Sequence, residues 1–305
     1  MLDKKIIKLS IKDRYYPKRL KDKGIDITLY AMGNIDLLNS TYTVSIVGSR
    51  DSIRQALEFT EELSKNLSLN RVTVISGGAL GVDSYAHRGA LKGEGGTVVV
   101  LGSGLNLPYP QRNFPLFREI LNKGGLLLSQ FESDTPPFRF NFIKRNFLIS
   151  ALSDIVVVVR AGAKSGTFHT VRSAIKLDKK IGIVPGNPWE RDAKGINSLL
   201  YELKDRISII RDHRDILKIL GIYEDGEKGQ LSLERLDDLF LKNLPKEYRN
   251  ILRLLERRPY HWDELIDSLN ISPQKLSTII LDLELNNIIK DIGNKTYILL
   301  KESKV

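Results

Sequence analysis

The chain of 305 residues contains no cysteine, which excludes disulfides, thiolate metal sites and cysteine nucleophiles together. It also lacks any apolar stretch close to the roughly 20 residues that a membrane-spanning helix requires. The first residues, MLDKKIIKLSIKDRYYPKRL, contain no apolar core of the kind that secretory signal peptides have. We therefore expect a soluble protein of the cytoplasm.

Both standard nucleotide fingerprints are missing as well. The sequence has no G-x-x-x-x-G-K-[ST] segment, and GSGLNLP at 102–108 does not match G-x-G-x-x-G. ATP and NAD are therefore not expected as ligands, and no cofactor or metal is predicted.

Positive charge, in contrast, is in excess. The net charge of +10 and the pI of about 9.5 indicate an anionic partner, with nucleic acid as the first candidate. Residues 138–180 hold nine Lys or Arg against two Asp, and Phe138, Phe140, Phe142 and Phe147 lie among them. Cations interleaved with aromatic rings suit a phosphate backbone and stacked bases; a solvated basic face without a ligand is the alternative.

Apolar runs and helical patterns alternate through the middle of the chain. The runs, at 43–48, 71–76, 96–102, 125–130, 154–160 and 181–186, are rich in β-branched residues. Continuous apolar strands separated by helices are typical of a parallel sheet covered on both faces. The sequence therefore predicts an α/β fold, a doubly wound, mostly parallel Rossmann-like sheet over residues 41–225, after a lead-in segment of residues 1–40.

The C-terminal part has a different pattern. A Gly-rich and charged stretch at 226–240 is typical of a linker. Residues 241–305 then read as three helices, the third with Ser272 as N-cap and Pro273 at N1, followed by two strands around Gly293-Asn294. This order predicts a small winged-helix domain.

Three predicted strands end in loops rich in Gly, Ser and Thr. Because the carboxyl ends of parallel strands share one edge of the sheet, these loops are expected to meet there. Glycine lets backbone N–H groups approach an anion, and helix N-termini add partial positive charge. The candidate phosphate-binding residues are Gly48, Ser49 and Arg50, then Ser76, Gly77, Gly78 and Ala79, then Lys164, Ser165, Gly166 and Thr167.

The same segments carry a family resemblance. VSIVGSR, SGGALGVDSYAHRGAL, VVVLGSGLNLPYPQRN, FIKRNFLISALSDIVVVV, SGTFHTVRSA and IVPGN, spread over residues 15–200, resemble the DNA-processing protein A (DprA/Smf) family in order and spacing. The resemblance implies a dimeric protein that binds single-stranded DNA and loads the recombinase RecA onto it in natural transformation and DNA recombination.

The resemblance also implies site residues. It places Ser49, Arg50 and residues 76–79 in a DNA pocket and adds the basic-aromatic segment, for which we name Arg139, Phe140, Asn141, Phe142, Lys144, Arg145 and Asn146. Three positions depart from the family pattern: Gln130 and Arg160 stand where acids are usual, and Phe147 replaces an arginine. We expect these departures, taken together, to make the pocket more basic.

Two other functions compete with this hypothesis. Asp83 and His87, four residues apart, could serve acid–base catalysis; we expect instead a structural pair, with Asp83 bonding backbone at a helix start and His87 as its partner. A nucleotide phosphoribohydrolase would carry P-G-G-x-G-T and a following glutamate, whereas this chain has AGAKSGTFHT, so we expect no enzyme. A regulator that grips double-stranded DNA through the winged helix is the third class, although residues 239–305 balance eleven Lys or Arg against nine Asp or Glu.

Overall fold

The computed structural model describes residues 5–163, 165–222, 245–255, 258–285 and 288–299. The chain divides into two units, Met1–Glu224 and Asp225–Val305, and each is described by itself. The predicted linker at 226–240 lies outside the described residues, and so does Lys164.

The first unit is built on a nine-stranded sheet with the order β1-β2-β6-β5-β4-β3-β7-β8-β9. All neighbours from β6 to β9 are parallel, whereas β1 pairs with β2, and β2 with β6, in antiparallel fashion. The strands are β1 (Ile7–Leu9), β2 (Leu29–Gly33), β3 (Thr43–Gly48), β4 (Thr73–Ser76), β5 (Thr97–Leu101), β6 (Leu126–Ser129), β7 (Ile155–Arg160), β8 (Lys180–Ile183) and β9 (Ile207–Ile209). The predicted doubly wound, mostly parallel sheet is confirmed.

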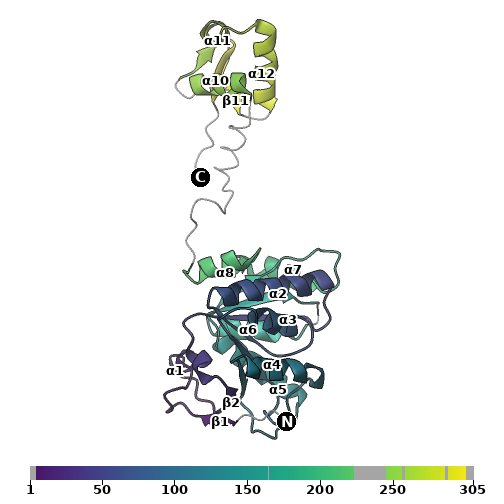
Figure 1. The fold of residues 1–305 in the computed structure, drawn as a ribbon. Coiled ribbons are helices and arrows are strands. Elements are labelled where there is room, and N and C mark those ends of the chain that lie inside the picture. The colour runs from purple at the N-terminus through teal and green to yellow at the C-terminus, as the bar shows by residue number, and fades with distance from the viewer. Residues whose placement is uncertain (1–4, 164, 223–244, 256–257, 286–287, 300–305) are drawn as a thin grey trace. The chain divides into compact units, whose positions relative to one another are not determined.

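Helices cover both faces of the sheet (Figure 1). They are α1 (Lys18–Lys21), α2 (Arg54–Leu69), α3 (Val82–Ala90), α4 (Phe114–Asn122), α5 (Arg139–Ala151), α6 (Thr167–Lys176), α7 (Lys194–Leu203) and α8 (His213–Ile219), with 3-10 turns η1 (Ile35–Asn39), η2 (Gln111–Asn113) and η3 (Lys204–Arg206). Successive strand side chains alternate between the faces. Ile46 packs toward α2, α3 and α8, and Val99 toward α4 on the same side, whereas Val47 packs toward α5, α6 and α7. Most strand residues are therefore apolar, as the sequence runs predict.

The described residues of the predicted lead-in segment, 5–40, do not merely precede the sheet, because they contribute its strands β1 and β2. Tyr16 is fully buried among them, and its hydroxyl contacts the carbonyl oxygens of Ile25 and Ile27. β1 is a short edge strand and β2 runs antiparallel to both of its neighbours, so neither belongs to the alternation of strands and helices by which the sequence reveals the parallel strands.

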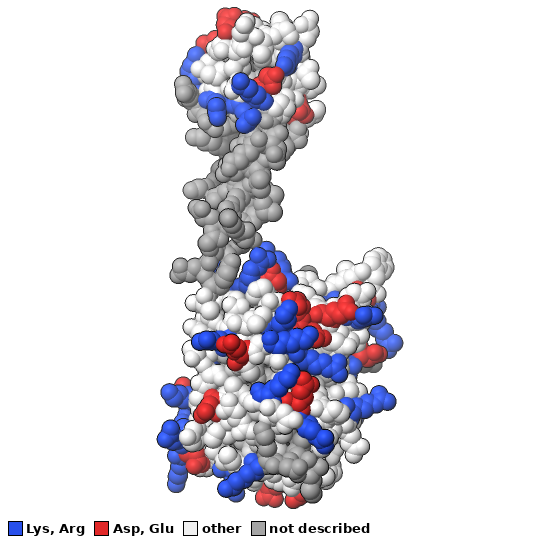
Figure 2. Space-filling model, in the orientation of Figure 1, with Lys and Arg blue, Asp and Glu red and all other residues white. Residues whose placement is uncertain are grey.

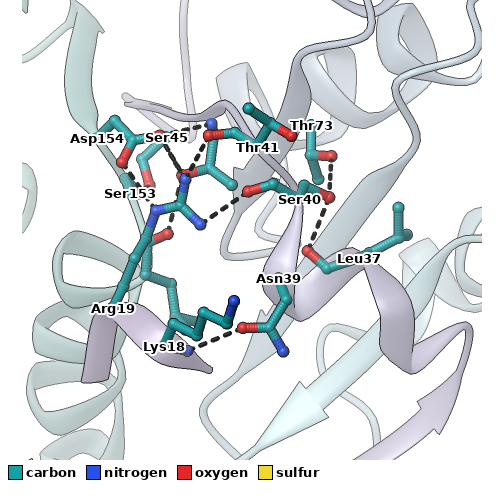
Figure 3. A network of polar contacts seen from close by, with 12 residues as sticks. Lys18, Arg19, Leu37, Asn39, Ser40, Thr41, Ser45, Thr73, Ser153 and Asp154 are labelled. Atoms are coloured by element: carbon teal, nitrogen blue, oxygen red, sulfur yellow. Dashed lines mark hydrogen bonds and ion pairs between the residues drawn. The ribbon is translucent and has the colours of Figure 1, made fainter. Parts of the chain in front are cut away.

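An ion pair joins this N-terminal segment to the parallel strands (Figure 3). Nε and Nη2 of Arg19 contact the two carboxylate oxygens of Asp154 at 2.8 and 2.6 Å. The carboxylate also accepts a 2.8 Å hydrogen bond from the backbone N–H of Thr43. Burial by itself would raise the pKa of Asp154, but the hydrogen bonds and charge of Arg19 outweigh it and hold that pKa below its usual value. These contacts connect α1 to the first residue of β3 and to the residue just before β7.

The described part of the second unit contains three helices and a three-stranded sheet of order β10-β12-β11. Its elements are α10 (Lys246–Leu255), β10 (Tyr260–His261), α11 (Trp262–Leu269), α12 (Pro273–Leu285), β11 (Ile289–Asp291) and β12 (Thr296–Leu299). Leu265, Leu276 and Ile280 are at the centre of its core. The hydroxyl oxygen of Ser272 accepts a hydrogen bond from the N–H of Lys275, as an N-cap does. This is the predicted winged-helix arrangement.

Candidate functional site

A cavity of about 1310 Å³ opens at the carboxyl ends of β3 and β7. We call it the strand-end cavity. Its walls come from the loop between β3 and α2, the exposed side of α5, the start of α6, and the loop between β8 and α7. The convergence follows from the topology, because all these loops leave parallel strands at the same edge.

The structure brings most of the predicted site residues to this cavity. Those that line it are Gly48, Ser49, Arg50, Ala79, Arg139, Phe142, Arg145, Asn146, Ser165, Gly166 and Thr167. Those that do not are Ser76, Gly77, Gly78, Phe140, Asn141 and Lys144. Lys164 is not among the described residues.

The glycine loop after β4 packs into the protein instead of facing a ligand. The hydroxyl of Ser76 donates to the carbonyl oxygen of Ile46 at 2.6 Å. A Cβ at Gly77 would lie 1.8 Å from Nη1 of Arg145, so this glycine makes room for a side chain of the protein itself. Gly78 has a φ of +67°, and its carbonyl accepts a hydrogen bond from Nδ2 of Asn113. The expectation that residues 76–78 expose donors to a phosphate is therefore not met.

The carboxylate of Asp83 accepts hydrogen bonds from backbone N–H groups of that loop. Its Oδ2 accepts hydrogen bonds from the N–H groups of Gly77 and Ala79 at 3.2 and 3.3 Å. Burial raises the pKa of Asp83, and the charge of Arg145 opposes the rise. These are the backbone contacts expected of a carboxylate that braces a helix start.

His87 is not the partner of Asp83, and that expectation is wrong. Its Nδ1 lies 2.8 Å from Oγ1 of Thr97, which donates to the carbonyl oxygen of Val74. Nδ1 therefore carries the proton, and the buried Nε2 has no partner among the described residues. Burial lowers the pKa of His87 to about 3, so the ring is neutral. In the part of the chain that the structure describes, no group of His, Asp or Glu is arranged to hold a metal ion.

Arg145 is part of the cavity floor. It is 4% exposed, and its Nη1 donates to the carbonyl oxygens of Gly77 and Val100. Burial lowers its pKa to about 10, and the charge of Asp83 opposes that fall. A guanidinium held in this way supports the loop after β4 more than it offers charge to a ligand.

The loops that precede α2 and α6 present polar groups to the cavity. Gly81, with a φ of +75°, allows α3 to approach the carbonyl oxygens of Ser49 and Arg50, which fixes the loop after β3. The guanidinium of Arg50 is exposed and lies 5.8 Å from the ring centre of Phe142. At the start of α6, the hydroxyl oxygen of Ser165 accepts from the N–H of Thr167, and Gly166 has open space around it.

Cations and carboxylates at the cavity differ in how they are paired. Three of the four lining carboxylates bond to the protein: Asp83 to backbone, Glu190 to Arg160 at 3.5 Å, and Asp192 to the hydroxyl of Ser52 at 2.9 Å. The exposed lining cations form no ion pair with any residue described; they are Arg50, Arg139, Arg191 and Lys194. The unpaired charge at the cavity is therefore mainly positive.

The face drawn in Figure 2 differs from the cavity, because Lys and Arg residues on that face are interspersed with Asp and Glu residues. The excess positive charge of the chain does not by itself form a patch on that face.

The loop between β8 and α7 is the part of the site that the loop analysis missed. It supplies Glu190, Arg191 and Asp192, and Lys194 follows as the first residue of α7. The rule that identified the other loops applies to this loop as well, because it also follows a parallel strand and therefore reaches the same edge of the sheet.

The three departures from the family pattern do not add charge to the cavity, contrary to expectation. Gln130, Phe147 and Arg160 are absent from its lining. Arg160 is 8% exposed and pairs with Glu190, and Phe147 packs against the core beneath α5 and α6. Arg160 thus acts on the cavity indirectly, because it holds the loop that carries Arg191.

Fold and site together define a doubly wound α/β protein with a cation-lined cavity at its strand ends, joined to a winged helix. A family model described as DNA recombination-mediator protein A matches residues 8–221, and one described as DprA winged helix domain matches residues 241–291. The chain belongs to the DNA recombination-mediator protein A family, which confirms the resemblance to DprA/Smf proteins.

Individual relatives agree with this assignment. Protein Smf of Escherichia coli (strain K12) is 32% identical over 206 residues, which cover 68% of this chain and 54% of that protein. The chain spans about half the length of the first curated relatives it matches. DNA processing protein DprA of Streptococcus pneumoniae (strain R6) is 32% identical over 63% of this chain and 68% of that one.

Solved structures extend the comparison to the fold. The X-ray structure of DNA processing protein A from Streptococcus pneumoniae has a TM-score of 0.64 at 29% identity, over 70% of this chain and 74% of that chain. A structure of DNA processing protein A from Helicobacter pylori has a TM-score of 0.63 at 31% identity, over 73% of this chain and 99% of that chain. The latter concerns the single-stranded DNA binding mode of the Helicobacter protein. No helix among the described residues is long and apolar enough to cross a membrane.

Proposed function

We propose that this protein binds single-stranded DNA in the strand-end cavity. The observation that carries the proposal is a set of cations that form no ion pair with any described residue, around a cavity whose carboxylates are mostly bonded internally. These cations are Arg50, Arg139, Arg191 and Lys194. Cations without partners inside the protein attract a phosphate backbone without first breaking an ion pair. The Helicobacter relative, described by its single-stranded DNA binding mode, supports the choice of ligand.

Aromatic side chains beside these cations supply surfaces for the bases. The guanidinium groups of Arg50 and Arg145 lie 5.8 and 5.7 Å from the ring centre of Phe142. Phe138 and Phe140 are 60% and 61% exposed at the start of α5, and are therefore more open to stacking than Phe142. Single strands suit such a surface, because their bases are free to stack on protein rings.

The test is a salt titration of binding to a single-stranded oligonucleotide. For single strands, the logarithm of the affinity falls with the logarithm of salt concentration by about 0.7 per phosphate contact. Arg50→Ala should weaken binding to every sequence and reduce this slope by about 0.7. Arg54→Ala is the matched control, since Arg54 is exposed nearby on α2 but pairs with Glu58 and does not line the cavity. Equal affinity and slope for wild type and Arg50→Ala would disprove the assignment.

The wider role follows from the family rather than from the cavity. We propose that the protein protects incoming DNA and loads the recombinase RecA in transformation and recombination, as a homodimer of the sheet domain in the cytoplasm. Loading is measured as RecA filament growth on an oligonucleotide precoated with single-strand binding protein, and the dimer by sedimentation. Unchanged filament growth on adding this protein would contradict loading.

We propose that the protein acts by binding and not by catalysis. Asp83 and His87, the acid–base candidates, are both buried and bonded to loop backbone or to Thr97. Release of ribose phosphate from nucleoside monophosphates would show that a phosphoribohydrolase activity is present and overturn this assignment.

A further inference from the structure

The turn between β8 and α7 carries a tryptophan that the protein leaves in solvent. Trp189 is 92% exposed, more than any other large apolar side chain among the residues described. Indole is a large amphipathic ring that proteins usually bury at least in part. Such exposure therefore suggests that Trp189 contacts something other than its own chain.

The turn that presents Trp189 is fixed. The N–H of Trp189 donates to Oδ1 of Asn187 at 3.0 Å, and the N–H of Glu190 donates to the carbonyl oxygen of Asn187 at 3.0 Å. Pro188 between them restricts the backbone further. The indole therefore stands on a defined support, which lowers the entropy lost when it binds.

Side chains on the far side of this turn anchor it to the cavity wall. Glu190 pairs with Arg160, and Oδ2 of Asp192 accepts from the hydroxyl of Ser52 and the N–H of Ile53 at the start of α2. Glu190 lines the strand-end cavity and is the next residue after Trp189, so their Cα atoms are about 3.8 Å apart. Trp189 is therefore the neighbour in the chain of a residue of the cavity wall, although it is not itself among the lining residues.

The neighbourhood of Trp189 resembles the rest of the proposed site in its chemistry. Arg191 on the same loop and Lys194 at the start of α7 form no ion pair with any described residue, and the same holds for Arg50 and Arg139 on the other segments. Aromatic rings next to unpaired cations are the combination that single-stranded nucleic acids contact. Two further exposed rings, Phe138 and Phe140, lie at the start of α5, a separate segment of the wall.

We propose that Trp189 stacks on a base of the single strand at the mouth of the cavity, beside a phosphate held by Arg191. This inference rests on the proposed single-stranded DNA binding and adds a contact from the loop between β8 and α7. It extends the binding surface from α5 across the cavity to the start of α7.

The experiment uses the fact that the chain has two tryptophans. In the full-length Trp262→Phe variant, Trp189 is the only indole, and its fluorescence is titrated with an oligothymidylate. The emission should be quenched and should saturate at the oligonucleotide concentration at which the anisotropy of a labelled strand also saturates. In the otherwise wild-type chain, Trp189→Ala should weaken binding roughly 5- to 150-fold, the range measured for loss of one stacked base.

Two comparisons separate stacking from other effects. Trp189→Ala should leave the salt slope unchanged, because no phosphate contact is lost, whereas Arg191→Ala should reduce it by about 0.7. Tyr201→Ala is the control for an exposed ring, since Tyr201 is 76% exposed on α7 and does not line the cavity. Trp189→Phe should recover part of the lost affinity, because it keeps a ring.

Each outcome decides the proposal. If the wild type binds the strand with the expected salt slope while Trp189→Ala binds equally tightly, the stacking contact is wrong and the proposed function stands. If the wild type does not bind at low salt, both are overturned. If the emission of Trp189 changes with protein concentration in the absence of DNA and does not respond to the oligonucleotide, the indole contacts another copy of the chain, and stacking is refuted.

Discussion

Replacing Arg145 by alanine tests whether this residue supports the site or contacts the ligand. Its guanidinium is buried and bonded to the carbonyl oxygens of Gly77 and Val100, with the carboxylate of Asp83 in the same environment. Hydrogen bonds to charged groups contribute about 1.5–3 kcal/mol each, and breaking a buried charge pair costs about 3–5 kcal/mol. We expect Arg145→Ala to destabilise the first unit by about 3–5 kcal/mol.

Scanning calorimetry measures this effect. For a unit of this size, each kcal/mol shifts the melting temperature by about 2–4 °C, so a decrease of about 6–20 °C is expected. Lys144→Ala is the matched control. Lys144 is the neighbouring exposed cation on α5 and lies outside the cavity, so its loss should change the stability by less than about 0.5 kcal/mol.

A different result would restore the role that the sequence suggests for Arg145. If Arg145→Ala unfolds within about 0.5 kcal/mol of the wild type but lowers the salt slope of binding by about 0.7, the guanidinium contacts a phosphate. The structural role would then be refuted.

Three further predictions concern the frame of the site. Arg19→Ala should lower the free energy of unfolding, measured by urea denaturation, by about 2–4 kcal/mol. The difference from the wild type should shrink as the pH falls below the ordinary Asp pKa of 3.8, because protonation of Asp154 removes the same ion pair. His87 has a pKa of about 3 in the native state and near 6.5 in the unfolded state, so between these values the unfolded state binds the extra proton, and acidification lowers the stability by about 1.4 kcal/mol per pH unit. His87→Gln should lack this contribution. Parallel pH profiles of stability for the wild type and the variant would contradict this prediction. Gly77→Ala should destabilise by about 1–3 kcal/mol, because its Cβ meets the buried guanidinium behind it, whereas Gly166→Ala, with open space around it, should have no measurable effect on unfolding.

The parallel part of the fold could be predicted because burial leaves a clear pattern. Every residue of β5 and β7 is buried, and both strands appear in the sequence as apolar runs, with Thr97 at the start of β5 and Arg160 at the end of β7 as their polar members. β1 and β9 have three residues each and are mostly not buried, and such short edge strands carry no comparable signal. The same holds for the Arg19–Asp154 pair, whose members are separated by 135 positions in the chain.

The glycines show why the site itself could be predicted only in part. Sequence reasoning identifies a close approach at Gly77 but not what approaches, and the neighbour is the guanidinium of Arg145 rather than a phosphate. Gly166, in a loop of the same composition, has open space around it and lines the cavity. The guanidinium of Arg145 fills the space beside Gly77, whereas Asn146 of the same helix reaches only the carbonyl oxygen of Gly166. This difference is a property of packing and not of the loop sequence.

The positions of the Lys and Arg residues in the sequence likewise predict the charge of the cavity only in part. In residues 138–180, the basic stretch that stands out in the sequence, only Arg139 and Arg145 among the described Lys and Arg residues line the cavity, and Arg145 is committed to the protein's own carbonyls. The unpaired cations Arg191 and Lys194 lie beyond that stretch and Arg50 lies far before it. A parallel sheet gathers the loops that leave its strands at one edge, so the charge of a strand-end site is better counted loop by loop than along a continuous segment. Counted in that way, the loop after β8 contributes Arg191 to the cavity as the loop after β3 contributes Arg50, and it carries Trp189 next to Glu190 of the cavity wall.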